Sequence, residues 1–142
     1  MGKSIVTIIV LMMSLSSCKN NGQNISNSEE SMKNEIDKEF ETIITEIKTS
    51  NTYESPTNWE ERGLNQSENS IVKLLRETTN EFLNELTLIH NSSDSEKLKL
   101  ERINKIVDNL PWSSLDTEEK EFLADVLAPA IHATGFNPWT IF

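Results

Sequence analysis

The sequence predicts an all-α protein, a small helical bundle of three to four amphipathic helices behind a disordered tether. Apolar residues recur at spacings of three and four in four separate stretches, which is the period of a helix with one buried face. Asn, Ser, Pro and Gly gather in the connections between these stretches. No run of alternating apolar and polar residues is long enough to favour a strand.

The first amphipathic helix is expected over residues 29–49. Ser26 and Glu29 have the spacing of a capping box at its amino end. Acidic residues cover one side, and apolar residues form the other: Met32, Ile36, Phe40, Ile43, Ile44 and Ile47. The pattern leaves open whether this helix packs on the rest of the chain or extends as a stalk.

A connecting loop is expected over residues 50–66, where a proline and a glycine interrupt the helical pattern. It is longer than the usual connection in a compact domain. Two interpretations remain for such a segment. Either it is mobile, or Tyr53, Trp59 and Leu64 hold it against the core.

Residues 67–142 are expected to form the compact helical domain. Its helices are predicted over about 67–90 and 94–109, with a last helix beginning at Asp116. Their core-facing residues are Ile71, Leu74, Leu75, Thr78, Phe82, Leu86 and Ile89, in a stripe that Leu83 and Leu88 widen; Ile103, Ile106, Val107 and Leu110; and Phe122, Leu123, Val126, Leu127, Ala130 and Ile131.

Capping residues mark the starts of these helices. Ser67 is predicted as the N-cap of the first. Ser93 with Glu96, and Asp116 with Glu119, have the spacing of capping boxes.

Two prolines and a glycine mark the ends. Pro111 should stop the preceding helix, and Pro129 should kink the last one by removing a backbone hydrogen bond. Gly135 is placed for a left-handed cap at its carboxyl end.

The first 17 residues have the order of a secretory signal peptide. Lys3 precedes an apolar run over 5–15, and two serines then lead into Cys18. The run has eleven residues, whereas a membrane-spanning helix needs about 20. A permanent transmembrane helix is therefore not expected here.

Leu15-Ser16-Ser17-Cys18 resembles the lipobox of bacterial lipoproteins. The resemblance implies cleavage between Ser17 and Cys18, a diacylglycerol group on the Cys18 sulfur, and an acyl chain such as palmitate on its new amino group. An ordinary signal peptide followed by a chance cysteine is the alternative. The only cysteine of the chain stands where lipidation requires it, which favours the lipobox.

Residues 18–28, the lipidated Cys and a polar segment, are expected to be a flexible tether, because they offer almost nothing to bury. The formal net charge of −10 at pH 7 argues against nucleic acid as a partner, since nucleic-acid binding needs basic surface. The membrane is expected as a partner through the lipid anchor alone.

The sequence gives no indication of catalysis. His90 and His132 stand at the predicted ends of helices, where a cation complements the helix dipole. No catalytic residues, metal ligands or small-molecule substrate are inferred, because the spacings of known catalytic and phosphate-binding motifs do not occur. We expect a protein that is not an enzyme and has no cofactor besides its covalent acyl chains.

Four aromatic residues near the carboxyl end are candidate partner-binding residues: Trp112, Phe136, Trp139 and Phe142. In one interpretation, which we favour, the two tryptophans fold back and cap the core of the bundle. In the other, the tail aromatics stay partly exposed as a binding hot spot, where such residues dominate the binding energy.

The short signal, the lipobox, the Asn- and Ser-rich tether and the small acidic helical body resemble the surface lipoproteins of Borrelia-like spirochaetes, small proteins of plasmid type. Residues 115–131 are loosely similar to a helix of the small multicopy lipoproteins in that group, although this chain lacks their later cysteines and their basic segment after the tether. The broader resemblance implies a cell outer membrane protein that faces the host.

Two functions are therefore expected. The first is a non-catalytic module on the cell surface that contacts a host protein, in host interaction or immune evasion. The alternative is a lipoprotein facing the periplasm, with a structural or assembly role and an endogenous protein partner.

Overall fold

The computed structural model describes the backbone of residues 22–142 and the side chains from residue 30 onward. These residues form helices and no strands, which confirms the predicted all-α class. The elements are α1 (Gly22–Thr49), α2 (Pro56–Glu60), α3 (Asn69–His90), α4 (Glu96–Asp108), η1 (Trp112–Ser114), α5 (Thr117–Ala133) and η2 (Pro138–Thr140), where η marks a single turn of 3-10 helix. The predicted signal peptide and Cys18 lie outside the described residues.

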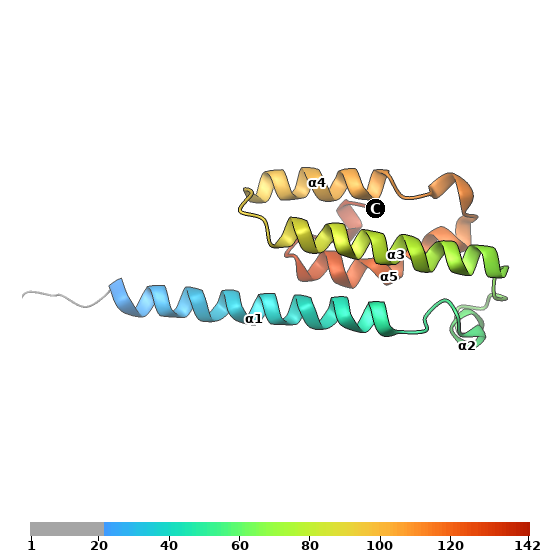
Figure 1. Ribbon diagram of the computed structural model, residues 1–142, viewed down its shortest axis with the longest axis horizontal. Coiled ribbons are helices and arrows are strands. Elements are labelled where there is room, and N and C mark those ends of the chain that lie inside the picture. Colours follow the sequence, from blue (N-terminus) through green and yellow to red (C-terminus); the bar gives the residue numbers. More distant parts are fainter. Residues whose placement is uncertain (1–21) are drawn as a thin grey trace, which may run out of the picture.

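The four long helices run alternately in opposite directions along one axis (Figure 1). Short links between α3 and α4 and between α4 and α5 favour this antiparallel arrangement. Helix α5 packs against α1 and α3, and α3 also packs against α4. One continuous core joins all of them: Phe40, Ile44, Tyr53, Trp59, Val72, Leu75, Phe82, Leu83, Leu86, Ile89, Ile103, Val107, Leu110, Leu115, Phe122, Leu123, Leu127, Ala130 and Ile131.

Helix α1 both packs on the bundle and extends beyond it. Phe40 and Ile44 are buried in the core, whereas Met32 and Ile36 are 57% and 51% exposed. Figure 1 shows the amino end of α1 projecting past the neighbouring ends of α3 and α4. The helix begins at Gly22 and not near residue 28, so part of the expected tether has helical backbone, while residues 18–21 lie outside the description.

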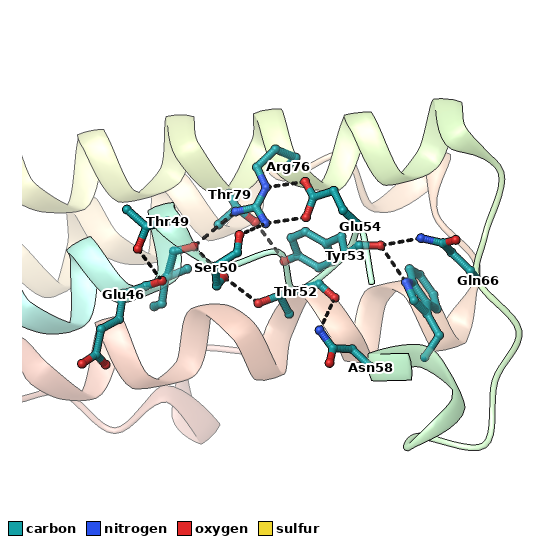
Figure 2. Close-up of polar contacts among 12 residues, drawn as sticks. Glu46, Thr49, Ser50, Thr52, Tyr53, Glu54, Asn58, Gln66, Arg76 and Thr79 are labelled. Atoms are coloured by element: carbon teal, nitrogen blue, oxygen red, sulfur yellow. Dashed lines mark hydrogen bonds and ion pairs between the residues drawn. The ribbon is translucent and has the colours of Figure 1, made fainter. Parts of the chain in front are cut away.

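The segment between α1 and α3 is held against the core. Tyr53 and Trp59 are 0% and 1% exposed, and Leu64 is partly buried. The Trp59 indole N–H donates to the carbonyl oxygen of Tyr53 at 2.9 Å, and the Tyr53 hydroxyl lies 2.9 Å from that of Thr79 on α3 (Figure 2). Of the two interpretations of this segment, the one in which its aromatic residues anchor it is confirmed.

Arg76 on α3 fastens the start of the same segment. Its guanidinium donates to both carboxylate oxygens of Glu54 at 2.8 Å. It also donates to the carbonyl oxygens of Ile47 and Ser50, at 3.2 and 2.7 Å (Figure 2). One side chain thereby satisfies carbonyl groups at the carboxyl end of α1, which no intrahelical donor reaches.

The caps agree with the sequence at α5 and differ at α4. Asp116 and Glu119 form the predicted capping box. At α4 the N-cap is Ser95, whose hydroxyl accepts from Leu98, so the predicted box of Ser93 was wrong by two residues. Ser93 lies within the turn before α4, where the Ser92 hydroxyl donates to the Asp94 carboxylate, and the helix begins at Glu96.

Ser67 does not cap α3, because Glu68 occupies the N-cap position. The Ser67 hydroxyl instead donates to Oε1 of Glu119 at 2.6 Å. The other oxygen of Glu119 accepts from the backbone N–H of Asp116 at 2.9 Å. Glu119 is 7% exposed, so both hydrogen bonds help to offset the desolvation of its carboxylate.

The left-handed cap after α5 follows the prediction. The helix continues through Pro129 to Ala133. Gly135 then adopts a φ of +92°, and its N–H donates to the carbonyl oxygen of His132 at 2.9 Å. This left-handed residue turns the chain into the carboxyl-terminal tail.

Candidate functional site

The carboxyl-terminal tail presents Trp139 to solvent. Its short helix η2 packs against α5, and Pro138, the first residue of η2, is buried. The side-chain oxygen of Asn137 accepts from the N–H of Trp139 at 3.1 Å, which fixes the start of η2. The Trp139 side chain is 66% exposed, and its backbone is held in a defined turn.

Trp112 and Phe142 form an aromatic pair beside the bundle. Their ring centroids lie 6.4 Å apart, with the ring planes at 89°. The indole N–H of Trp112 donates to the carbonyl oxygen of Val107 at 2.9 Å, and the ring packs on the core. Phe142 is 38% exposed. We call Trp112, Trp139 and Phe142 the aromatic surface.

Phe136 lies elsewhere. It is partly buried against the core and lines a hollow of about 420 Å³, together with Ile36, His90 and Lys99. The structure therefore divides the four predicted residues. The favoured interpretation, in which both tryptophans fold back on the core, is confirmed for Trp112 but is wrong for Trp139, which remains exposed. Of the two phenylalanines, Phe136 is partly buried and Phe142 is exposed.

The two histidines occupy the last turns of α3 and α5, as their sequence positions indicate. His132 is exposed. The His90 ring stacks on Phe40 of α1 at a centroid distance of 4.0 Å, and its Nε2 lies 3.1 Å from the Asp37 carboxylate. Sequence reasoning missed this contact between α1 and α3, because it depends on two residues far apart in the chain.

The ionisable groups form structural pairs. A hydrogen bond from Arg76 holds the pKa of Glu54 below its ordinary value. A hydrogen bond from Arg102 does the same for the pKa of Asp94. Burial raises the pKa of the Tyr53 hydroxyl well above its ordinary value. Each of these groups lies against another segment or turn, which indicates a role in holding the fold.

The described residues, 22–142, show neither a cluster of metal-ligating side chains nor a helix that could span a membrane. Among these residues, no group of three or more His, Cys, Asp or Glu side chains could hold a metal ion. Over the same range, no helix is long and apolar enough to cross a membrane.

Comparison with protein-family models, curated proteins and solved structures gave no match to this chain. Its function is therefore inferred from its own residues. Exposed aromatic rings on a fixed backbone suit the recognition of another protein, because they bury a large area and lose little conformational freedom. The aromatic surface is the candidate functional site.

Proposed function

We propose that this chain is a lipid-anchored bacterial surface protein whose aromatic surface binds a host protein. The observation that carries the binding role is the exposure of Trp139 on a backbone fixed by Asn137 and buried Pro138. An aromatic ring held in this way can enter a pocket on a partner with little ordering of the backbone, which favours affinity.

The anchoring role rests on the lipobox at residues 15–18. Two or more acyl chains on Cys18 would give lasting membrane attachment, where a single chain gives only marginal attachment. Helix α1 follows a few residues later, and its 28 residues span about 42 Å at the usual rise. The projecting amino end of α1 suits a connection between an anchor and the bundle (Figure 1).

Lipidation is tested first, on the chain isolated from cells. Mass spectrometry is expected to show acyl chains on Cys18, and detergent-phase partition should place the chain in the detergent layer. The Cys18→Ala variant should move to the aqueous layer. An unmodified thiol at Cys18 would contradict the anchor.

Exposure on the cell is tested by protease treatment of intact bacteria. A surface protein is degraded under this treatment, whereas a marker protein of the periplasm survives. Survival of this chain until the cells are broken would instead favour the role in the periplasm with an endogenous partner.

Binding is tested by capturing serum proteins on the purified chain. Trp139→Ala with Phe142→Ala should abolish the retention of a specific protein that the parent chain retains. Met32→Ala is the matched control, since Met32, like Trp139, is more than half exposed but lies on α1. Equal capture by parent and double variant would show that the aromatic surface is not the binding site.

A further inference from the structure

A second surface lies on the hairpin of α3 and α4. The two helices enclose an open groove of about 630 Å³, with Leu74, Phe82, Ile106 and Leu110 among its lining residues. Helix α4 lies at the edge of the bundle, and within the described part of the chain α3 is the only helix that it packs against closely (Figure 1). The open side of this hairpin is available to another helix pair.

Exposed leucines extend the apolar character of this face. Leu88 is 62% exposed and Leu98 is 42% exposed. Leu88 follows the groove residue Glu85 by three positions, and Leu98 precedes the groove residue Arg102 by four. Residues at these spacings share one side of a helix, so both leucines lie on the groove side.

The two helices carry opposite charges along the groove. Glu81 and Glu85 line it from α3, and Arg102 and Lys105 line it from α4. Glu81 and Lys105 each lie twelve residues from Ser93 in the turn, so they stand level in the antiparallel hairpin. Among the described residues, Arg102 pairs with Asp94, whereas no ion pair involves Glu81, Glu85 or Lys105.

We propose that this face binds a second copy of the chain, with the two-fold axis parallel to the helices. This axis packs α3 of each copy against α4 of the other. It leaves every residue at the same position along the direction of the helices. Glu81 then faces Lys105 of the other copy, and Glu85 faces Arg102. Each pair occurs twice, as a two-fold interface requires, and the apolar linings meet between four helices.

The charges favour this axis over the alternative two-fold axis, perpendicular to the helices, which would also bring the two faces together. A two-fold axis perpendicular to the helices would place α3 on α3, so that the glutamates of the two copies would face each other and repel. The parallel axis also brings the amino ends of both copies to the same end, as two chains anchored in one membrane would need. The groove and its charges do not depend on that anchor.

The test measures dimerisation of the full chain, in detergent if the chain requires it, by sedimentation over a range of concentrations. Glu81→Lys and Lys105→Glu should each weaken the dimer about tenfold, because each replaces two attractive pairs by two repulsive ones. A mixture of the two variants should recover the parent affinity, since the reversed charges are again complementary. Glu121→Lys on α5 and Lys38→Glu on α1 are the matched charge controls, and they should leave the affinity unchanged.

Leu98→Ser provides an independent measurement on the apolar part of the face. The side chain is exposed in one copy, so the variant should keep the helical circular dichroism of the parent while its dimer weakens. A chain that stays monomeric at every concentration would overturn the proposal. So would failure of the mixed charge variants to recover affinity, or a tighter dimer of Glu81→Lys alone, which the perpendicular axis predicts.

Discussion

Arg76 joins three parts of the chain through one guanidinium group. It bonds the Glu54 carboxylate and the carbonyl oxygens of Ile47 and Ser50 (Figure 2). The hydrogen bond from Arg76 lowers the pKa of Glu54 in the folded state. The stabilising effect of this carboxylate is therefore present above its unfolded pKa, which is about 4.3. It is lost as the pH falls through the lower folded value.

Replacement of Glu54 should show this pH dependence. Glu54→Gln is expected to lower the free energy of unfolding at neutral pH. The difference from the parent should shrink as the solution is acidified below the folded pKa. Urea denaturation at a series of pH values measures it, with Glu121→Gln as the control for an exposed carboxylate. A difference that does not change with pH would contradict the ionic origin.

Tyr53 and Thr79 form a buried hydroxyl pair, and both side chains are 0% exposed. Tyr53→Phe should lower the free energy of unfolding by about 1–3 kcal/mol, because it leaves the Thr79 hydroxyl buried without this partner. The double variant with Thr79→Val removes both groups and should recover part of the loss. Chemical denaturation of the three variants tests this. If the double variant loses as much as the two single variants added together, the hydroxyls do not stabilise each other.

At the scale of elements, a helix cap formed by residues close together in the sequence was predictable. Which of several neighbouring polar residues would take the N-cap position was not. Asp116 and Glu119 form the predicted cap of α5, because both hydrogen bonds involve residues three apart. Ser67 does not have its predicted role at α3, because the helix begins one residue later with Glu68 as its N-cap, and the Ser67 hydroxyl instead donates to a distant carboxylate, that of Glu119. Helix α2 was not predicted, because its five residues are too few to show a helical period, although Pro56 stands at its start and Trp59 is buried.

Gly135 ends α5 in a conformation that other residues adopt with strain. Its φ is +92°, and an added Cβ would meet no atom within 4 Å. Gly135→Ala should therefore lower the free energy of unfolding through the backbone alone, by about 1 kcal/mol. Gly135→Asn should lose less, because asparagine tolerates this conformation better. Thermal unfolding of both variants measures the order, and an equal loss would show that the conformation is not the cause.

At the scale of the whole molecule, the period of the apolar residues identified which faces are buried but not which faces meet. Phe40 and Ile44 were visible as part of a stripe, yet only the structure shows that they join the core while Met32 and Ile36 on the same helix stay exposed. The groove between α3 and α4 was likewise hidden, since its two walls come from separate stripes. The exposure of Trp139 depends on how the tail packs, which no local pattern determines.

Phe122 tests whether the segment after α1 and the helices unfold together. Its ring lies 5.2 Å from that of Tyr53 and 4.8 Å from that of Trp59, and the Arg62 guanidinium carbon lies 4.6 Å from its centroid. Phe122→Ala should lower the free energy of unfolding by about 3–5 kcal/mol. That is a large part of the 5–15 kcal/mol typical of a domain, so we expect the variant to be largely unfolded near 37 °C.

These contacts connect the loop to α5. The thermal unfolding curves of Phe122→Ala, followed by tryptophan fluorescence and by helical circular dichroism, should therefore have the same midpoint temperature. Met32→Ala, at a half-exposed position, should melt with the parent. Separate transitions would mean that the loop unfolds without the helices. A cooperative melt of Phe122→Ala near the parent temperature would show that this ring does not hold the bundle together.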